Sequence, residues 1–458
     1  MISSINDFRH PFFIGVAGSG MSALAQYLKG IGKEVGGSDR FFAPGVYNET
    51  QGKLEADGIR CYIQDGSGIT EATDLVVCST AIEDTVIEMQ KAKQLNIPIL
   101  RRSELLALIA ASKKTIAVGG TSGKSTTSAM LFDILEFAGQ QPSIISGAGL
   151  ISIIKEGRIG NAKVGEGELL VIEADESDGS IVQYKPEIGL LLNIDKDHQE
   201  IDELLRIFGV FKNNSRKFIT NQSHPLTASL SVQWANDFAT DERRDAGYTA
   251  TDFSQSGMEI RFNVNNQPFS LHLPGKHNME NAVAATAVAH QLGVDLATCA
   301  AALKKYEGIY RRHQVLGQKH GVWMIDDYAH NPVKCAAAIA ACQPIAPKVI
   351  AWFQPHGYKP TKFLRADFVK ELAAVLRPSD EIWMSEIFYA GGTAVKDISA
   401  NDLINDLKAL GKQAFFVEQR NEFIETVRPH LENNTVLLLM GARDPSLEQF
   451  AKECWGRL

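Results

Sequence analysis

The stretch TIAVGGTSGKSTTSAML, from Thr115 to Leu131, places a lysine and several hydroxyl side chains directly after a glycine-rich turn. An apolar run of β type precedes the turn and a segment that suits a helix follows it, which is the order found in phosphate-binding loops. In such loops, backbone N–H groups and a lysine hold the β- and γ-phosphates of a nucleotide, while a hydroxyl ligates Mg²⁺. The pattern predicts these roles for Lys124 and Ser125. Val118 stands where the usual motif has its first glycine, so the loop is a shorter variant. The alternative is a glycine-rich turn with a solvated lysine.

A cluster of carboxylates in the run EADESDGS comprises Glu173, Asp175, Glu176 and Asp178. Like charges this close repel one another, so either the segment is solvent-exposed or some of its members bind a cation. Mg²⁺ carried by a nucleotide is such a cation, because it prefers hard oxygen ligands. His198 ends the run NIDKDH after another apolar stretch and is expected to face the same metal region, although a lone histidine is more often structural.

Glycines near the start of the sequence predict a second phosphate-binding turn. Gly15, Gly18 and Gly20 follow the apolar run PFFI, and Asp39 stands about where an acidic residue contacts a ribose hydroxyl. The order G-x-x-G-x-G differs from the dinucleotide-binding order G-x-G-x-x-G. The same turn is suited to another diphosphate at a helix N-terminus. A tight turn without a ligand is the alternative.

Further polar residues follow other apolar runs. The segment GKHNMENAVAA places Asn278 and Asn281 at the start of a helix, where N-cap chemistry alone would explain them. IDDYAHNP offers Asp327 and His330, and FQPHGYKPTK offers His356. Taken singly, each of these segments is also consistent with a polar turn.

The elements that position these residues are short apolar runs followed at once by glycines or polar side chains. Runs of this kind are typical of strands buried on both faces, and helical stretches such as 22–30 and 331–342 lie between them. The sequence therefore predicts an α/β chain with parallel sheets, whose ligands gather at the carboxyl ends of the strands. The runs are FFIGVAGSG, LVVCSTA, TIAVGGTSGKS, LLVIEADESD, IGLLLNIDKDH, VWMIDDYAHNP, VIAWFQPHG and VLLLMGARD.

Composition restricts the class of protein. The chain has 458 residues, of which 45% are hydrophobic and 22% charged, with a net charge of −8. A mildly acidic balance argues against a broad nucleic-acid surface, which needs concentrated lysine and arginine. The six cysteines form no C-x-x-C pair, so reduced, buried thiols are expected. No leader and no apolar run long enough for a membrane span is evident, which predicts a cytoplasmic protein.

The length suggests about three domains. Basic residues before the phosphate loop and the pair Arg311 and Arg312 mark joints near 108 and 310. We therefore expect domains at 1–108, 109–310 and 311–458. A patch over 230–275 alternates apolar and polar residues, as a small antiparallel sheet would.

Taken in order, the motifs resemble the Mur ligases, the ATP-dependent amino-acid ligases of peptidoglycan synthesis. The resemblance runs from Phe12 to Asp444 and rests on the phosphate loop, EADESD, NIDKDH, GKHNMEN, RRHQVLG, IDDYAHNP, FQPH and LLLMGARD. It implies a Rossmann-like N-terminal domain for a UDP-sugar, a central P-loop-type ATPase domain with a parallel sheet, and a Rossmann-like C-terminal domain. The implied reaction joins L-alanine to the carboxylate of UDP-N-acetylmuramate through an acyl phosphate, with ATP and Mg²⁺, in a monomer or homodimer.

The resemblance also implies roles for individual residues. Around the UDP group it places Gly18, Gly20, Ser38, Asp39 and Ser79. Around ATP it places Gly120, Thr121, Gly123, Lys124, Ser125, Thr126, Asn278, Asn281, Arg312 and Asp327. The implied metal ligands are Ser125, Glu173 and His198. The implied catalytic set is Lys124, Glu173 and His198, with His330 and His356 at the incoming amino acid.

This chain departs from the alanine-adding branch at several positions. Ser122 replaces a histidine in the phosphate loop, and Asn331 stands where a second histidine is common. Gly357 and Pro360 stand near positions that generally carry arginine, the bidentate partner of a carboxylate. The identity of the acceptor amine is therefore open. Alternatives are a related ligase that attaches a murein tripeptide, a non-catalytic nucleotide-binding relative, and an NAD-dependent oxidoreductase using the N-terminal glycines, which leaves the second phosphate loop unexplained.

Overall fold

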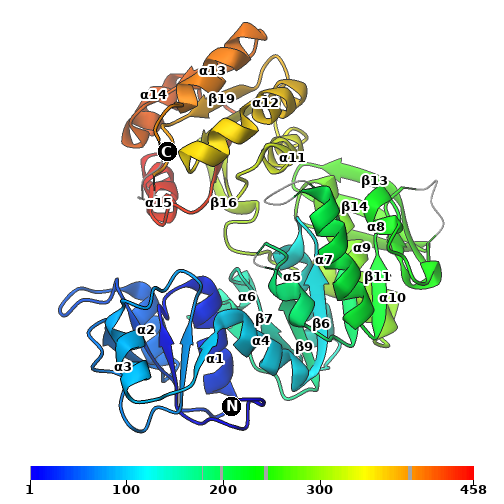
Figure 1. Ribbon diagram of the computed structural model, residues 1–458. Coiled ribbons are helices and arrows are strands. Elements are labelled where there is room, and N and C mark those ends of the chain that lie inside the picture. The colour runs from blue at the N-terminus through cyan, green and yellow to red at the C-terminus, as the bar shows by residue number, and fades with distance from the viewer. Residues whose placement is uncertain (1, 178, 196–199, 242–245, 390–394) are drawn as a thin grey trace. The chain divides into compact units, whose positions relative to one another are not determined.

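The computed structural model describes residues 2–177, 179–195, 200–241, 246–389 and 395–458. The chain divides into two compact units. The first contains Met1–Asp252, Phe262–Phe269 and Glu280–Ile309, and the second contains Phe253–Arg261, Ser270–Met279 and Tyr310–Leu458. Figure 1 shows α/β layering, with helices packed against sheets. The predicted apolar runs all form strands, which confirms the α/β class.

The N-terminal sheet is parallel throughout and has the order β3-β2-β1-β4-β5. Its central strands β1 and β4 are apolar and fully buried, as expected for strands covered on both faces. The strands are β1 (Pro11–Ile14), β2 (Gly36–Asp39), β3 (Arg60–Ile63), β4 (Leu75–Cys78) and β5 (Ile99–Arg101). The helices are α1 (Ser19–Gly30), α2 (Glu49–Ala56), α3 (Ile87–Gln94) and α4 (Arg102–Ala111).

The central sheet has the order β11-β10-β6-β9-β7-β8, with only β8 running antiparallel to its neighbour. Its strands are β6 (Lys114–Gly119), β7 (Ser143–Ile145), β8 (Ala162–Lys163), β9 (Leu169–Glu173), β10 (Ile188–Leu191) and β11 (Lys217–Thr220). Its helices are α5 (Lys124–Phe137), α6 (Ile151–Ile154), η1 (Ser180–Gln183), α7 (Ile201–Asn214), α8 (Pro225–Ala228) and η2 (Trp234–Asn236).

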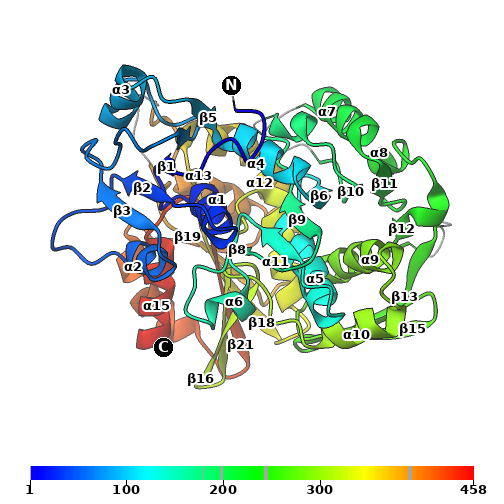
Figure 2. The same cartoon turned by 90° about the horizontal axis from the view of Figure 1, so that it is seen from below.

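A small four-stranded sheet follows, in the order β12-β13-β14-β15, within the patch predicted from alternating residues. The edge strand β12 pairs with β13 in parallel, so the expected antiparallel pattern does not hold at that edge. Helices α5 and α10 pack side by side (Figure 2). The elements are β12 (Phe238–Ala239), β13 (Tyr248–Ser256), β14 (Glu259–Val264), β15 (Gln267–Leu271), α9 (Lys276–Gln291) and α10 (Leu296–Lys304).

The C-terminal sheet has the order β16-β17-β21-β18-β19-β20 and is parallel except for the edge strand β16. Its strands are β16 (Gln314–Lys319), β17 (Val322–Asp327), β18 (Lys348–Gln354), β19 (Glu381–Met384), β20 (Gln413–Phe416) and β21 (Thr435–Gly441). Its helices are α11 (Pro332–Cys342), α12 (Tyr358–Val375), α13 (Ala400–Ala409), η3 (Arg420–Glu422), α14 (Phe423–Val427), η4 (Arg428–His430) and α15 (Leu447–Arg457). None of the helices in the described ranges is long and apolar enough to cross a membrane.

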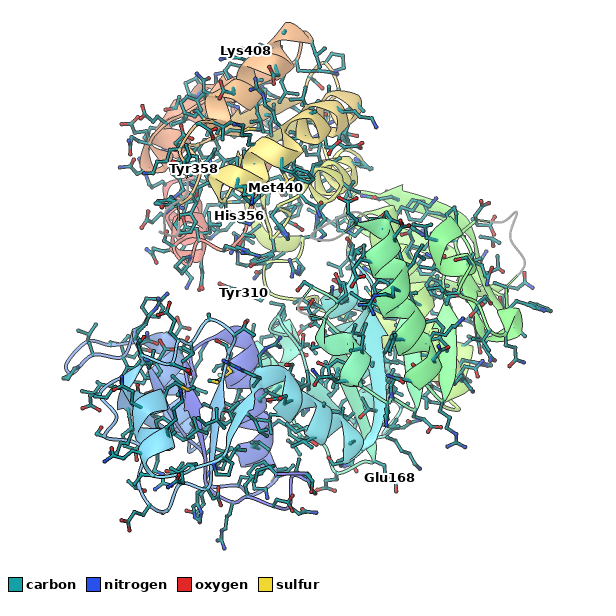
Figure 3. The ribbon with its side chains drawn as sticks, viewed as in Figure 1. Glu168, Tyr310, His356, Tyr358, Lys408 and Met440 are labelled. Carbon is teal, nitrogen blue, oxygen red and sulfur yellow. The ribbon has the colours of Figure 1, made fainter. Side chains whose placement is uncertain are left out.

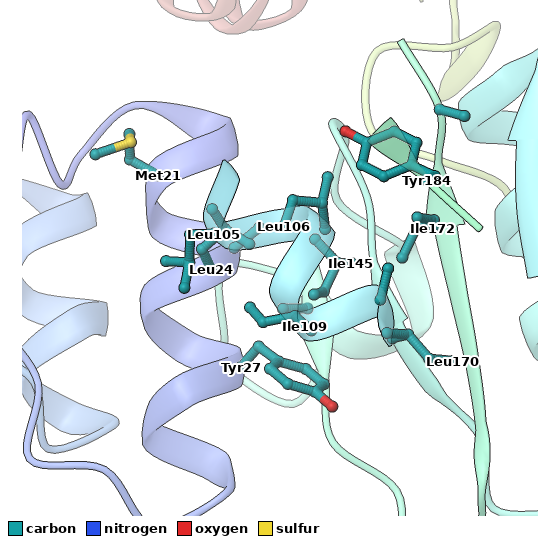
Figure 4. Packing of buried hydrophobic residues seen from close by; sticks show 14 of the residues in the cluster. Met21, Leu24, Tyr27, Leu105, Leu106, Ile109, Ile145, Leu170, Ile172 and Tyr184 are labelled. Carbon is teal, nitrogen blue, oxygen red and sulfur yellow. The ribbon is translucent and has the colours of Figure 1, made fainter. Parts of the chain in front are cut away.

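The N-terminal and central sheets share one hydrophobic core. Figure 4 shows Leu24 and Tyr27 of α1 facing Leu105 and Ile109 of α4, with residues of β7 and β9 beyond them. A buried hydrogen bond from Gln26 Nε2 to the side-chain oxygen of Asn161, 2.7 Å long, adds a specific polar contact between α1 and the segment before β8. The proposed joint at 108 therefore falls within a helix whose apolar side chains belong to this shared core.

A pair of histidines is buried in the second compact unit. The rings of His277 and His313 lie 6.2 Å apart between centroids. Cys342 Sγ is 3.7 Å from His313 Nε2. Burial lowers the pKa of both imidazoles to about 4, and at His277 the neighbouring His313 lowers it further while Asp327 opposes the change. Both rings are therefore neutral at pH 7.

We predict that the second unit loses stability on acidification. Both histidine pKa values lie below their ordinary value, so between about pH 6.5 and 4 the unfolded chain binds protons that the folded unit does not, and unfolding becomes easier as pH falls. Across this window, protonation linked to each ring lowers the unfolding free energy by on the order of 3 kcal/mol. Urea unfolding followed by tryptophan fluorescence at pH 7, 6 and 5 measures the slope.

His313→Asn should flatten the dependence of the unfolding free energy on pH, even if the poorer packing of the asparagine lowers the unfolding free energy at every pH. His272 is exposed, so His272→Asn is a matched control and should leave the slope unchanged. Equal slopes for the wild type and His313→Asn would contradict the assignment.

Candidate active site

The phosphate loop joins the buried strand β6 to helix α5. Gly123 is the N-cap residue of α5, with a left-handed φ of 84°. A Cβ at this position would overlap the side-chain oxygen of Asn281. Gly120 has a φ of 137°, and a Cβ added there would lie 3.1 Å from the Cβ of Leu192. The loop therefore requires glycine at these two positions, both for backbone conformation and for close approach of the neighbouring strand and helix.

Asn193, just after β10, holds the loop from the side. Its side-chain oxygen accepts hydrogen bonds from Thr121 Oγ1 at 2.9 Å and Ser122 N at 2.8 Å. Its amide group donates to Ser122 O at 3.1 Å. Thr121 Oγ1 also accepts from Asp195 N at 3.0 Å. Three strands thus converge here, because β10 and β9 flank β6.

The Lys124 side chain is half-buried and held by two hydrogen bonds. Its ammonium donates to Gly120 O and to the Glu176 carboxylate, each at 2.7 Å. Burial lowers the pKa of Lys124, but the carboxylates of Glu176 and Asp175 outweigh burial and hold the pKa above its ordinary value. The lysine is therefore a fixed positive charge at the loop. Two of its three N–H donors are used in these contacts, which leaves the third for a phosphate group.

Glu173 and Ser125 lie together, as the sequence predicts. Ser125 Oγ donates to Glu173 Oε2 at 2.8 Å. Glu173 Oε1 accepts from Ser146 Oγ at 2.7 Å and from Gly147 N at 2.6 Å, which fixes the orientation of the carboxylate. A hydroxyl and one carboxylate fit Mg²⁺, which keeps several waters and takes further ligands from substrate phosphates. Across the described ranges, no group of three or more His, Cys, Asp or Glu side chains forms a metal cage. His198 and Asp178 lie outside the described residues.

The asparagines expected on the adenine side are both buried. Asn281 Oδ1 accepts from Thr127 Oγ1 at 3.1 Å and lies against Gly123. Asn278 donates to Pro274 O at 2.8 Å. Asn281 therefore supports the phosphate loop, and its role toward a nucleotide base stays a prediction.

The predicted UDP residues lie at the carboxyl ends of three adjacent strands, β2, β1 and β4. Gly15 has a φ of 80° and donates its N–H to Ser38 O at 2.7 Å. Asp39 accepts from Ala17 N and from Phe41 N, each at 3.0 Å. Asp39 thus orders both loops around the turn while being only 5% exposed. Gly18 caps α1, so its loop suits a diphosphate at a helix N-terminus.

Arg102 is a residue at this turn that sequence reasoning did not select. A Cβ added to Gly20 would lie 3.0 Å from the Arg102 side chain. Its charge also lowers the pKa of Asp175, in addition to the larger contributions of Lys124 and Ser177, against the effect of burial. In the sequence, the basic run before the phosphate loop was the only feature that drew attention to Arg102.

In the second unit, a pair of arginines and a pair of aspartates meet at the end of β17. Arg311 donates to Asp326 at 2.9 Å and to Gly441 O at 3.1 Å. Asp327 accepts from His313 N and Ala329 N, each at 2.6 Å, and burial raises its pKa while Arg312 opposes the change. The Arg312 guanidinium lies 4.4 Å from the centre of the Tyr328 ring. Arg312 and Asp327 are thus neighbours, as expected.

The two histidines predicted at the amino-acid end also lie together. The ring centroids of His330 and His356 are 5.6 Å apart. His330 Nδ1 is 2.9 Å from Tyr328 O, which sets the orientation of that ring. His356 follows β18, and Figure 3 labels it close to Met440 of β21. The β17-β21-β18 order brings both imidazoles to one edge of the C-terminal sheet.

The Gly123 contact yields a prediction that separates backbone strain from steric overlap. Gly139 also has a left-handed φ of 75°, but no atom lies within 4 Å of a Cβ added there. Gly139→Ala should therefore lower the unfolding free energy by about 1 kcal/mol through backbone strain alone. Gly123→Ala should cost at least about 2 kcal/mol more, because Asn281 is buried and hydrogen-bonded and cannot easily move. Differential scanning calorimetry of the full-length variants measures both effects on the unfolding of the first unit.

In an Asn281→Ala background, the added cost of Gly123→Ala should shrink, since the obstructing oxygen is gone. A Gly123→Ala variant no less stable than Gly139→Ala would contradict the proposed overlap.

Comparisons with known proteins cover nearly the whole chain. Three family profiles match, described as Mur ligase family, catalytic domain (residues 11–114), Mur ligase middle domain (118–289) and Mur ligase, glutamate ligase domain (311–443). The chain is 33% identical to the UDP-N-acetylmuramate–L-alanine ligase of Syntrophomonas wolfei, over 94% of each protein. It is 34% identical to the enzyme of the same name from Pelotomaculum thermopropionicum, over 95% of each.

Solved structures agree. The UDP-N-acetylmuramate-alanine ligase of Thermotoga maritima superposes with a TM-score of 0.79 at 27% identity, covering 98% of both chains. A murein peptide ligase from Psychrobacter arcticus has a TM-score of 0.67 at 19% identity, again over 98% of both chains, and shows likeness of fold alone. The predicted three-domain architecture is confirmed, whereas the exact boundaries stay a prediction. The chain belongs to the Mur ligase family, and within it resembles the alanine-adding ligases.

Proposed function

We propose that this protein joins L-alanine to the carboxylate of UDP-N-acetylmuramate, with hydrolysis of ATP to ADP and phosphate, in peptidoglycan synthesis. The observation that carries the proposal is the arrangement at the phosphate loop. Lys124 is a half-buried, charged lysine, and the Ser125 hydroxyl lies 2.8 Å from Glu173. These groups supply what phosphoryl transfer to a carboxylate requires: a cation for the phosphates and oxygen ligands for a magnesium ion.

The first step is activation of the sugar carboxylate. A carboxylate is a poor electrophile because its charge is delocalised, so transfer of the γ-phosphoryl group of ATP converts it to an acyl phosphate. Backbone N–H groups at the start of α5 and the Lys124 ammonium are placed to stabilise the phosphoryl oxygens. Mg²⁺, held by Ser125 and Glu173, would neutralise charge on the nucleotide phosphates. Lys124 has a third N–H donor beyond those that Gly120 O and Glu176 accept, so a phosphate can bind it beside the existing ion pair.

The second step is attack by the amino group of alanine on the acyl carbon. A tetrahedral intermediate forms, phosphate leaves and an amide remains. The attacking amine must be neutral and must lose a proton as the bond forms, and an imidazole is the usual acceptor near pH 7. We assign this role to the pair His330 and His356, whose rings lie 5.6 Å apart between centroids.

The UDP group is assigned to the strand ends of the N-terminal sheet. The glycine turn before α1 offers backbone N–H groups to a diphosphate, with Ser38, Asp39 and Ser79 at the same edge. Asp39 would act through its hydrogen bonds to the two loops rather than by a direct contact, because both of its oxygens accept backbone N–H groups. We place the protein in the cytoplasm as a monomer or homodimer, with no nucleic-acid or membrane partner.

A murein peptide ligase is the second candidate. It has a similar fold, and Gly357 and Pro360 supply no cation for a small amino acid. Identity of 33% with alanine ligases over nearly the whole chain favours alanine as the acceptor.

Phosphate release from ATP in the presence of UDP-N-acetylmuramate tests the proposal. We expect release with L-alanine, with mass spectrometry showing the amide product, and little release with the other amino acids or with a murein tripeptide. Lys124→Ala should abolish turnover, a loss of at least about 10³-fold, and should leave UDP-sugar binding intact. Release only with the tripeptide would favour the second candidate, and ligation by Lys124→Ala would exclude the mechanism.

The metal assignment yields a separate prediction. Glu173→Ala removes the carboxylate beside Ser125 and should raise the Mg²⁺ concentration needed for half-maximal activity by about tenfold or more. Glu168 is an exposed glutamate paired with Lys114, so Glu168→Ala is a matched control that should leave the Mg²⁺ titration unchanged. A titration that does not change in Glu173→Ala would remove Glu173 from the metal site.

A further inference from the structure

The loop after β21 displays an arginine to solvent at the edge of the C-terminal sheet. Arg443 is exposed and adopts a left-handed backbone with φ of 63°. We propose that the Arg443 guanidinium binds the α-carboxylate of the incoming amino acid. The inference rests on the proposed function and names the group that selects an acceptor carrying a carboxylate.

The acceptor itself sets the requirement. An amino acid carries a carboxylate at one end and the reacting amine at the other, so a cation that fixes the carboxylate also directs the amine. A guanidinium is suited to this task, because its parallel N–H groups match the two oxygens of a carboxylate. The start of α12, which follows His356, offers no such group: Gly357 and Pro360 carry no charge.

Strand register places Arg443 beside the two histidines. In the parallel pairing of β21 with its neighbours, Met440 is opposite Asp327 of β17 and Gly441 is opposite Gln354 of β18. His330 and His356 follow those two strands by three and two residues, and Arg443 follows Gly441 by two. The arginine therefore emerges from the middle strand, with a histidine on the loop of each adjacent strand.

The backbone at Arg443 is held on both sides. Before it, Gly441 O accepts from Arg311 at 3.1 Å. After it, Asp444 N donates to Ala442 O at 2.8 Å, and the Asp444 carboxylate accepts from Arg420 at 2.5 Å. A left-handed conformation is unfavourable for a side chain such as arginine and persists only where the surroundings impose it. Strain of this kind collects at functional sites, and here it directs an arginine out of a rigid loop.

Several nearby cations are already paired, whereas Arg443 is not. Arg311 pairs with Asp326, Arg420 with Asp444 and Lys362 with Asp397. Over the described ranges, the Arg443 side chain has no hydrogen bond or ion pair. Lys396 is engaged differently, since its ammonium lies 4.7 Å from the centre of the Tyr389 ring. An exposed guanidinium two residues beyond the end of β21 is thus available for an anion.

Arg443→Ala, Arg443→Lys and Arg443→Gly test the proposal in the full-length protein. Acyl phosphate formation from ATP and UDP-N-acetylmuramate is measured by hydroxylamine trapping, and ligation is measured separately with L-alanine. We expect Arg443→Ala to raise the KM for L-alanine by about 30-fold, as loss of a charge-assisted bidentate contact would. Acyl phosphate formation and the KM values for ATP and the UDP-sugar should not change. The KM of Arg443→Lys for L-alanine should lie between those of the wild type and Arg443→Ala. An ammonium keeps the charge but lacks the two parallel N–H groups of the guanidinium.

L-alaninamide supplies a chemical control, because it lacks the carboxylate. The wild type should prefer L-alanine to the amide, and Arg443→Ala should lose most of that preference. Arg443→Gly relieves the left-handed strain, so it should be at least as thermally stable as the wild type while showing the same rise in KM. Lys362→Ala removes an exposed cation of α12 that is paired with Asp397, and it should leave the KM for L-alanine unchanged.

An unchanged KM for L-alanine in Arg443→Ala would overturn the assignment, and so would a rise confined to ATP or the UDP-sugar, which would show that Arg443 serves a phosphate. Failure of the wild type to form acyl phosphate would overturn the proposed function as well. The two failures are therefore distinguishable.

Discussion

Much of this protein's chemistry depends on one buried ion pair. Lys124 lies in the interior at the end of β6, and a lone ammonium there would be costly. Glu176 and Gly120 O satisfy it, each at 2.7 Å. The pair keeps the lysine charged and fixed before any ligand arrives. Glu176 and Gly120 O use two of the three ammonium donors, which leaves one for a bound phosphate.

The same architectural rule places all of the candidate sites. In each of the three large sheets, central strands such as β1, β6 and β21 are apolar and buried, and polar residues follow where those strands end. Glycine turns after β1 and β6 bring backbone N–H groups to helix N-termini, which favour phosphates. The C-terminal sheet uses side chains instead, with His330, His356 and Arg443 at its edge. In the proposed function, this one architecture serves diphosphate, triphosphate and amino-acid chemistry in turn.

Sequence reasoning selected residues to which the proposed function assigns direct chemistry. Lys124, Ser125 and Glu173 could be predicted because their types and spacing match a mechanism, and the structure brings them together. Asn193 was missed, although it stands in the quoted run NIDKDH, because its role is to clamp the loop through hydrogen bonds at 2.8 and 2.9 Å. Glu176 was seen only as one acid of a cluster, and Arg102 only as part of a basic run.

By itself the sequence determined the most apolar strands, the α/β class and the phosphate loop, because buried parallel strands and glycine turns leave strong local patterns. The order of its motifs also indicated the family. Tertiary structure decided which carboxylate pairs with Lys124 and which supports Ser125, a choice that EADESD alone leaves open. It also decided that Asp39 orders two loops, and that Arg443, His330 and His356 follow three neighbouring strands. Those facts follow from strand order and register, which join residues far apart in the chain, and no local pattern encodes them.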